Sequence, residues 1–384
     1  LQDLCVFEPE RFDVVVIDEF HHAHAASYRK VLSHFRPKEL LGLTATPERG
    51  DGVSVADVFF GGRIASELRL WDALEADLLV PFHYFGIADG TDLRRLSFRR
   101  GQYDQGELSR LYLADRARAA KIVENTRQYV ADVGRMKALG FCVTVEHAHF
   151  MADYFTASGI PALALDGGSS RAEREAGLAA LRSGEVKALF TVDLFNEGLD
   201  IPDIDTVIMA RPTQSATIFL QQLGRGLRRT PTKAVLTVLD FVGHQHADFR
   251  FDVKFRALTG LGRRKLRTAV EAGFPFLPAG CHIELDRVTQ DEVLKNLTQT
   301  VKLRAAQLVA DIRVHAGDVR PYTLRSYLHD ADRSLADIYE GNPTATVRGR
   351  KIPRTWQALA GLALGEGKEI GAVSYTHLTL PTTP

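Results

Sequence analysis

Short apolar runs alternate with amphipathic stretches along most of the chain. Residues 13–17 form a β-branched run, DVVVI, which predicts a strand buried on both faces, as in a parallel sheet. A helical stretch at 27–35 and a second apolar run at 39–47 follow it, so this region predicts one α/β unit. Between 53 and 112 the pattern is less regular, and residues 84–87 predict a strand.

The pattern becomes regular after residue 115. Residues 115–136 place apolar side chains at helical spacing, which predicts an amphipathic helix. Strands and helices then alternate, with Gly and Pro at the joints, and this order predicts a second parallel sheet with crossover helices. The expected strands are residues 141–145, 162–165, 186–192, 206–210 and 235–241, and the expected helices are residues 149–158, 171–183 and 215–228.

Beyond residue 243 the sequence predicts mainly helices and loops. A Pro/Gly break occupies residues 273–280, and residues 288–313 and 322–340 predict helices. The last stretch, 373–384, is rich in Thr and Pro and fits no element, so it predicts a disordered or non-native tail.

The composition is that of a globular protein. With 384 residues, 45% of them hydrophobic and 25% charged, the chain is long enough for two or three domains. Lys plus Arg and Asp plus Glu each number 48, which excludes a protein that coats a polyanion by bulk charge but allows a local basic groove. Three widely spaced cysteines exclude a disulfide framework and a Cys-only zinc cluster. No apolar run approaches a membrane helix, so we expect a cytoplasmic protein without membrane contact.

Two adjacent carboxylates follow the first predicted strand. Asp18 and Glu19 begin the segment DEFHH at the carboxyl end of that strand, where α/β sheets place ligands. In phosphate-transfer motors the first acid holds Mg²⁺ through water, and the second orients or deprotonates the attacking water. Two alternatives stay open: a helix N-terminus, where acids favour the dipole, or a metal site of Asp18 with His21, His22 and His24.

Three further segments carry candidate chemistry. TATP, residues 44–47, ends the next strand. Its hydroxyls beside the carboxylates can relay the nucleotide state through hydrogen bonds; alternatively, the segment is a plain turn. In FTVDLFNEGLDIP, Gly198 allows close backbone approach, or is a routine loop glycine. In QQLGRGLRR, Arg225 and Arg228 are three apart, so both project from one helix face. They can reach one γ-phosphate, or they form a solvated basic face.

In this order, the segments resemble the motifs of a superfamily 2 helicase or translocase. DEFHH is similar to the DExH form of motif II, TATP to motif III, and residues 141–155 to motif IV. DLFNEGLDIP is similar to motif V and QQLGRGLRR to motif VI. The continuation TATPERGDG resembles the DNA-acting branch with restriction-enzyme motor subunits and excision-repair helicases. The resemblance covers roughly residues 10–245.

The resemblance implies an α/β fold of two RecA-like parallel-sheet domains, the first incomplete, followed by a mainly helical C-terminal region. ATP and Mg²⁺ would bind between the two domains. Carried over by position, Asp18 coordinates Mg²⁺ through water and Glu19 is the catalytic base. Thr44 and Thr46 link hydrolysis to movement on the strand of nucleic acid.

The resemblance also implies roles for residues of the second domain. His21 couples to Gln221 across the cleft, and Gly198 and Asp200 approach the nucleotide. A site split in this way makes closure of the domains depend on ATP. The implied arginine fingers are Arg225 and Arg228.

One family feature is absent from the sequence. The phosphate loop GxxxxGK[ST] belongs upstream of motif II and does not occur in this chain. We therefore interpret the chain as an N-terminally truncated fragment that is not expected to hydrolyse ATP alone. The expected parts are residues 1–75, the end of the first RecA-like domain; 76–135, a connecting segment; 136–245, the second RecA-like domain; 246–372, an accessory helical region; and 373–384, a tail.

The leading hypothesis is the motor core of an ATP-dependent DNA helicase or translocase, with nucleic acid, DNA rather than RNA, as its partner. Alternatives are a motor subunit of a restriction or defence complex with a nuclease elsewhere in the parent chain, an inactive DNA-binding scaffold, and a metal-dependent nuclease built on DEFHH. An upstream phosphate loop would favour the motor, and DNA cleavage without ATP would favour the nuclease. The basic runs at 94–100 and 262–267 are candidate phosphate contacts or solvated charges.

Overall fold

The structure is a computed structural model of the 384-residue chain, and it forms two compact units. One unit comprises Leu1–Glu67 with Val301–Pro384, and the other comprises Leu68–Thr300. The described residues are 4–20, 23, 26–44, 59–61, 63–99, 102–192, 203–213, 215–231, 233–247, 249–261, 263–300, 308–309, 312–313, 316, 323–330, 338–339, 344–347, 350–353 and 355–364.

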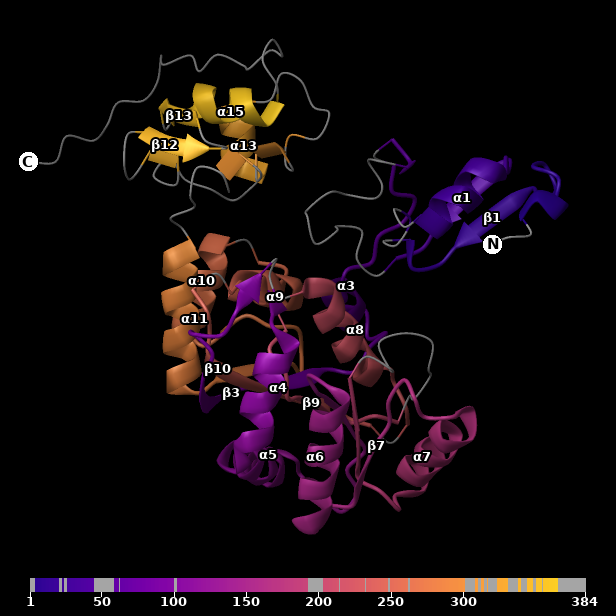
Figure 1. Cartoon of the computed structure of the whole chain (residues 1–384), viewed down its shortest axis with the longest axis vertical. Coiled ribbons are helices and arrows are strands. Elements are labelled where there is room, and N and C mark those ends of the chain that lie inside the picture. Colours follow the sequence, from indigo (N-terminus) through magenta and orange to yellow (C-terminus); the bar gives the residue numbers. More distant parts are fainter. Residues whose placement is uncertain are drawn as a thin grey trace, which may run out of the picture. The chain divides into compact units, whose positions relative to one another are not determined.

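The N-terminal segment contains the predicted strand, helix and strand. Strand β1 (Val14–Ile17) pairs in parallel with β2 (Glu39–Gly42), and helix α1 (Ala26–His34) connects them (Figure 1). A short 3-10 helix, η1 (Leu4–Val6), precedes β1. The prediction of one α/β unit is therefore confirmed.

The expectation that residues 13–17 are buried on both faces is wrong. Ile17 is 8% exposed and packs with Phe20 against side chains of α1, whereas Val14 and Val16 are each 54% exposed. Successive residues of a strand point to opposite faces, and α1 covers only one face of this two-stranded sheet. The β-branched run thus identified the strand but not its surroundings.

The second unit is built on a seven-stranded sheet with the order β11-β3-β10-β9-β6-β8-β7. Every pairing within it is parallel, as the alternation of strands and helices predicted. The strands are β3 (Phe82–Asp92), β6 (Ala138–Phe141), β7 (Ala162–Ala164), β8 (Ala188–Thr191), β9 (Thr206–Met209), β10 (Leu236–His244) and β11 (His282–Leu285).

Helices cover both faces of this sheet (Figure 1), so its central strands are apolar throughout. All four residues of β6, β8 and β9 are buried. A short antiparallel hairpin of β4 (Phe98–Arg99) and β5 (Gln102–Tyr103) follows β3. The helices are α3 (Leu70–Glu75), α4 (Gln105–Ala114), α5 (Arg116–Tyr129), α6 (Val145–Ala157), α7 (Arg171–Ser183), α8 (Ala216–Leu227), α9 (Phe251–Thr259), α10 (Arg263–Glu271) and α11 (Arg287–Thr300).

The strand predicted at 141–145 begins and ends earlier than expected. Thr144 is the N-cap of α6, and its side chain accepts a hydrogen bond from the backbone N–H of His147 at 3.3 Å. A Thr at this position satisfies one of the N–H groups that lack a helical partner. It therefore ends the extended segment and starts the helix four residues before the predicted 149.

The sheet is wider than the sequence pattern predicted. Strand β3, of which only residues 84–87 were expected, pairs with β10 on one side and with β11 on the other. Segments assigned to the connecting and accessory regions thus extend the same sheet as residues 136–245. The functional boundaries of the predicted domains stay a prediction.

The accessory helix α9 is tied to the sheet by a buried ion pair. Lys254 of α9 donates to the carboxylate of Asp240 on β10, and Tyr84 of β3 donates to the same carboxylate. The charged groups of Lys254 and Asp240 are almost completely buried. Breaking such a pair would leave an uncompensated buried charge, so α9 is fixed firmly against β3 and β10.

The described C-terminal part has its own small hydrophobic core. It contains α13 (Leu324–Asp330), an antiparallel hairpin of β12 (Thr344–Val347) and β13 (Arg350–Pro353), and α15 (Trp356–Leu364). Trp356 stacks on Tyr327 with ring centroids 5.4 Å apart. The sequence pattern did not predict this hairpin. Within the described ranges, none of the helices combines the length and apolarity needed to cross a membrane.

The two glycines of α8 differ sharply in the space around them. A Cβ on Gly226 would lie 2.2 Å from Cδ1 of Leu236, which is fully buried, whereas a Cβ on Gly224 would have no neighbour within 4 Å. Gly226 therefore lets α8 pack directly on β10.

We expect Gly226→Ala to lower the free energy of unfolding by about 1–3 kcal/mol, because the added methyl overlaps a side chain that cannot move away. Gly224→Ala, in the same helix, should be neutral or stabilise by up to about 1 kcal/mol. Urea denaturation of both variants, followed by circular dichroism, measures the difference. Equal midpoints for the two variants would contradict the close packing of α8 on β10.

Candidate functional site

The acid pair Asp18–Glu19 forms a tight turn directly after β1. The backbone N–H of Glu19 donates to Oδ1 of Asp18 at 2.9 Å, and Glu19 has a φ of 49°. This left-handed conformation is unfavourable for a residue with a Cβ, at a cost of about 1–3 kcal/mol, and persists only where the surroundings hold it. Asp18 is exposed and Glu19 is half-buried.

Phe20 holds this turn in place. Its side chain is fully buried, and its ring lies 5.3 Å and 5.1 Å from the rings of Phe59 and Phe60, measured between centroids. The backbone N–H of Phe20 donates to the carbonyl of Leu43 at 2.8 Å. Gly42 leaves the necessary room, since a Cβ there would lie 2.6 Å from the ring of Phe20.

The acid turn and the hydroxyl-bearing segment lie side by side. Leu43 accepts from Phe20 and donates its own N–H to the carbonyl of Ile17 at 2.9 Å. Thr44, the next residue, is half-buried. The structure thus brings together Asp18, Glu19 and Thr44, as expected for the carboxyl ends of neighbouring parallel strands.

The helix α8 carries Gln221 and Arg225 but ends before Arg228. Ser215 is its N-cap, Arg225 lies in its last turn, and Arg228 follows the helix with an extended backbone (φ −64°, ψ 137°). The carbonyl of Leu227 accepts from the N–H of Val80, which precedes β3, at 2.9 Å. Arg228 is thus the C-cap residue of α8 rather than an interior helical position, and the expectation that both arginines project from one helix face stays a prediction.

The end of α8 lies at the amino edge of the sheet. Its last residue, Leu227, bonds to Val80, and the N–H of Leu236 donates to the carbonyl of Pro81 at 2.9 Å, at the start of β3 and β10. Strand β8, by contrast, leads into the segment with Gly198 from the carboxyl edge.

Gln221 is half-buried, and its amide nitrogen is buried without a hydrogen-bond partner among the described residues. A buried donor left unpaired costs about 1–3 kcal/mol. The predicted site residues His21, Thr46, Gly198 and Asp200 lie outside the described residues.

A buried charged cluster near motif IV was not predicted. Nε of Arg118, on α5, donates to Oδ2 of Asp89 at 2.7 Å, and its Nη2 donates to the carbonyl of Ala210 at 3.0 Å. The two charged side chains are 1% and 0% exposed. Arg118 also lies 3.7 Å above the ring of Tyr112. The available signal was a charged residue four positions before Ile122, on the apolar face of the predicted helix.

His147 completes this cluster from the first turns of α6. It is fully buried, its Nδ1 accepts from the N–H of Val143 at 3.3 Å, and its ring lies 5.3 Å from that of Tyr112. Burial, with a smaller contribution from the cation of Arg118, lowers the pKa of His147 to about 3. His147 is therefore neutral at physiological pH and serves as an acceptor.

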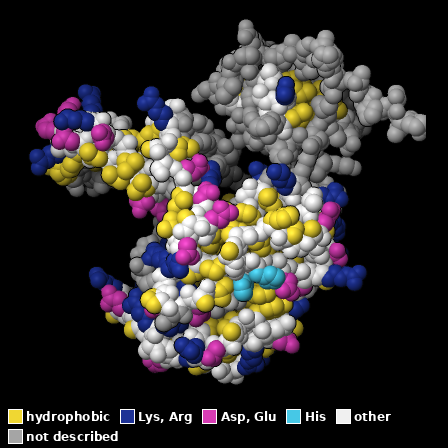
Figure 2. Space-filling view, turned by 180° about the vertical axis from the view of Figure 1, so that it is seen from behind, with side chains coloured by type: hydrophobic (Ala, Val, Ile, Leu, Met, Phe, Trp, Pro, Cys, Tyr) yellow, Lys and Arg dark blue, Asp and Glu magenta, His cyan; other side chains and the backbone are white. Residues whose placement is uncertain are grey.

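The described residues contain no cluster of three His, Cys, Asp or Glu side chains suited to a metal ion. Figure 2 shows histidines gathered on one surface among hydrophobic side chains. Two histidines on neighbouring strands, His83 and His282, have ring centroids 5.9 Å apart. The alternative metal site around Asp18 depends on three histidines, His21, His22 and His24, that lie outside the described residues.

Comparisons with known families match two segments of the chain. Residues 122–230 match the helicase conserved C-terminal domain, and residues 2–49 match the res subunit of type III restriction enzymes. The first match covers α6, α7 and α8 with the strands between them, and the second contains the Asp18–Glu19 turn. Both matches fall on the segments whose motifs carry the resemblance.

Individual relatives share the same region. A 51.5 kDa protein of a Lactococcus phage (isolate 7-9) is 30% identical over 234 residues, which are 61% of this chain and 50% of the relative. The DNA 3'-5' translocase XPB2 of Sulfurisphaera tokodaii is 26% identical over 289 residues, covering 64% of this chain and 62% of the translocase. The chain thus spans half to two thirds of the length of these relatives.

A solved structure shows the same fold. The ATP-dependent type ISP restriction-modification enzyme LlaBIII bound to DNA superposes with a TM-score of 0.52 at 16% identity. The superposition covers 80% of this chain and 25% of that chain. The predicted α/β architecture with RecA-like parallel sheets is therefore confirmed.

The buried His147 predicts a loss of stability in acid. Its pKa of about 3 lies below the value of about 6.5 in an unfolded chain, so the unfolded state binds the proton more readily. The stability linked to neutral His147 is fully present above pH 6.5 and is lost as the pH falls towards 3. We expect the free energy of unfolding to fall by about 2 kcal/mol between pH 7.5 and pH 5 because of this group.

Urea denaturation of the wild type and of His147→Gln at these two pH values tests this expectation. In His147→Gln, most of the difference in the free energy of unfolding between the two pH values should disappear. His149→Gln, which changes an exposed histidine two residues away, should show the wild-type difference within about 0.5 kcal/mol. If His147→Gln showed the wild-type pH dependence, His147 would not be the group that titrates.

Proposed function

Because the chain is a superfamily 2 helicase-like protein, we propose that it forms the motor core of an ATP-dependent helicase or translocase. In this function, ATP hydrolysis between two RecA-like units drives movement along nucleic acid. The observation that supports it most strongly is the Asp18–Glu19 turn, which Phe20 holds beside the segment that leads into Thr44.

The acid turn fits a hydrated magnesium ion. Asp18 is exposed at the carboxyl end of a parallel strand, and its Oδ1 already accepts the N–H of Glu19, so its other oxygen is directed to solvent. Mg²⁺ keeps several of its waters, and a single exposed carboxylate is a common protein ligand for it. Bound there with ATP, the ion would neutralise charge on the phosphates.

The other side chains act on the water and on the leaving phosphate. Glu19, whose backbone is fixed by the turn, orients the attacking water and accepts its proton. Arg225 and Arg228 reach the γ-phosphate from the second unit and stabilise the negative charge that develops on it. Gln221, with its unpaired amide nitrogen, couples to His21 and reports the closure of the two units.

We propose DNA as the nucleic acid, because XPB2 is named a DNA translocase and the LlaBIII structure was solved with DNA. The match of residues 2–49 to a restriction-enzyme subunit favours one second candidate, the motor subunit of a restriction complex whose nuclease lies elsewhere in the parent chain. Both candidates use the same motor chemistry and a cytoplasmic location.

Hydrolysis by a longer chain that includes the expected upstream phosphate loop tests this proposal. Glu19→Gln should lower DNA-stimulated ATP hydrolysis by about 10²- to 10⁴-fold, because it removes the base but keeps the shape of the side chain. Glu8→Gln, an exposed acid in the same unit, is the matched control and should leave the rate unchanged. Wild-type hydrolysis by the Glu19 variant, or DNA cleavage without ATP, would contradict a motor.

A further inference from the structure

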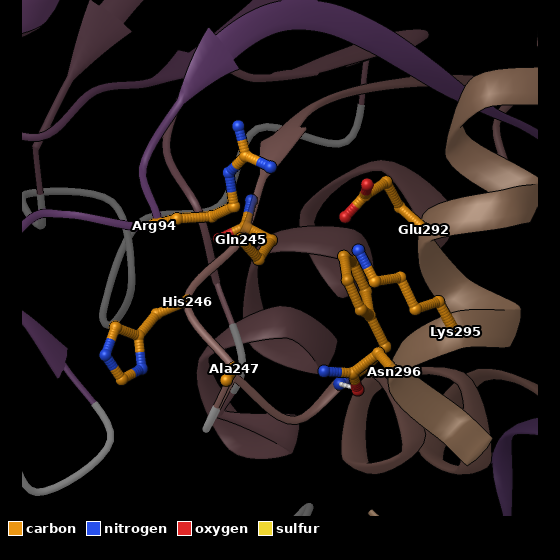
Figure 3. A pocket seen from close by; sticks show the side chains of 8 residues that line it. Arg94, Gln245, His246, Ala247, Glu292, Lys295 and Asn296 are labelled. Carbon is orange, nitrogen blue, oxygen red and sulfur yellow. Dashed lines mark hydrogen bonds between the residues drawn. The ribbon is translucent and has the colours of Figure 1, made fainter. Parts of the chain in front are cut away.

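A polar pocket of about 200 Å³ lies at the carboxyl ends of β3 and β10, outside all the recognised motifs (Figure 3). Arg94 follows β3, Gln245 and His246 follow β10, and Lys295 and Asn296 belong to α11. The pocket is therefore formed jointly by the edge of the sheet and the accessory segment after residue 245.

The oxygen acceptors of the neutral lining residues are already used within the protein. Oδ1 of Asn296 accepts from the N–H of Phe251 at 3.3 Å, and its Nδ2 donates to the carbonyl of Phe249 at 2.7 Å. The hydroxyl of Tyr103 accepts the N–H of His246 at 2.7 Å and donates to Oε1 of Gln245 at 2.9 Å. This chain of bonds fixes the carbonyl end of Gln245 towards Tyr103.

The amide nitrogen of Gln245 is left as an unused donor. The side chain is 7% exposed, and its nitrogen has no hydrogen bond to any residue that the structure describes. Figure 3 shows it directed to the same side of the pocket as the guanidinium of Arg94. This nitrogen is not one of the fully buried side-chain atoms without a partner, so solvent reaches it, and a ligand in the pocket can accept a hydrogen bond from it.

Two cationic side chains that line the pocket, Lys295 and Arg94, supply further hydrogen-bond donors. Lys295 is exposed and makes no hydrogen bond or ion pair within the described ranges. Arg94 binds Asp92 through Nε and Nη2, at 2.8 Å and 2.7 Å, which leaves its Nη1 group for another acceptor. One carboxylate lines the pocket: Glu292, whose Oε1 accepts from Nδ1 of His244 at 3.0 Å. Asp92, which is not a lining residue, is bound by Arg94.

Size restricts the class of anion. Pockets for drug-sized molecules or nucleotides occupy about 300–1,000 Å³, whereas this one has room for a single phosphate group and a few waters. Phosphates of a nucleic-acid backbone are bound by just such mixtures of Lys, Arg and amide donors, without regard to sequence. Two further exposed arginines, Arg95 and Arg99, extend the positive surface next to Arg94.

We propose that Gln245, Lys295 and Arg94 bind a backbone phosphate of the nucleic acid on which the motor moves. The identity of the ligand rests on the proposed function, whereas the affinity for a phosphate group does not. The accessory segment then contributes directly to the track of the nucleic acid, in addition to the contacts made by the motor motifs.

Binding of the 384-residue chain to a fluorescent DNA duplex, measured at several salt concentrations, tests the proposal. Lys295→Gln should weaken binding by about threefold or more and reduce the slope of log K against log salt by about 0.9, the value for one lost phosphate contact. Gln245→Glu keeps the acceptor for Tyr103 but replaces the donor by a carboxylate, so it should weaken binding at least as much.

Arg135→Gln is the matched control. It removes one exposed positive charge before β6, at the amino edge of the sheet, opposite the pocket, and should leave the affinity and the salt slope unchanged. Thermal melting shows whether each variant is folded. If the wild type binds DNA and neither Lys295→Gln nor Gln245→Glu changes the affinity or the slope, the pocket does not contact the backbone.

A second experiment uses inorganic phosphate and distinguishes affinity for a phosphate group from binding of nucleic acid. Phosphate should shift the side-chain amide resonances of Gln245 in the wild type but not in Lys295→Gln, with chloride at equal ionic strength as the reference. If the wild type shows this shift but binds no DNA, the pocket is a phosphate site and the proposed motor function fails for this chain. If neither phosphate nor DNA has an effect, the inference is overturned.

Discussion

A nucleotide site divided between two compact units is the constraint on which the proposed chemistry depends. The carboxylates Asp18 and Glu19 belong to one unit, and the guanidinium groups of Arg225 and Arg228 belong to the other. In the proposed function, the first set would supply the metal ligand and the base and the second would supply positive charge, so both would be needed around a triphosphate. Under this proposal, hydrolysis would require both sets at one nucleotide, and closure that depends on ATP could be converted into movement.

The two segments that carry these residues are each held by packing as well as by polar bonds. Phe20 keeps the acid turn in a backbone conformation that Glu19 would not adopt by itself, and Gly226 seats α8 against β10. Buried ion pairs tie the surrounding helices to the sheet: Arg118 with Asp89, and Lys254 with Asp240.

Periodic, buried segments were the part of the fold that could be predicted from the sequence. Helix α7 has the predicted bounds, and the strands β7 to β10 lie within one to three residues of theirs. The strand predicted at 141–145 was wrong because Thr144 is the N-cap of α6, so its hydroxyl marks the start of the helix. The exposure of Val14 and Val16 could not be read from the run DVVVI, because burial depends on what covers each face.

In the candidate site, too, some residues could be predicted from the sequence and others could not. The order of short motifs revealed the acid pair and the helix with Gln221, because their residue types are tied to the chemistry. Leu227, where α8 ends, accepts a bond from Val80, which is distant in sequence. The cluster around Arg118 and the pocket at Gln245 also arise from long-range contacts. Such sites have no local pattern, so sequence alone does not show them.

The central claim is most directly tested by the distance between the two units in the presence and absence of nucleotide. Spin labels at the exposed positions Lys38 and Arg135, one in each unit, would report it by pulsed electron resonance in a chain with the upstream phosphate loop. A non-hydrolysable ATP analogue with Mg²⁺ should narrow the distance distribution to one population, and substitution of Arg225 and Arg228 should abolish this change. A distance distribution that is the same with and without nucleotide would contradict a shared site.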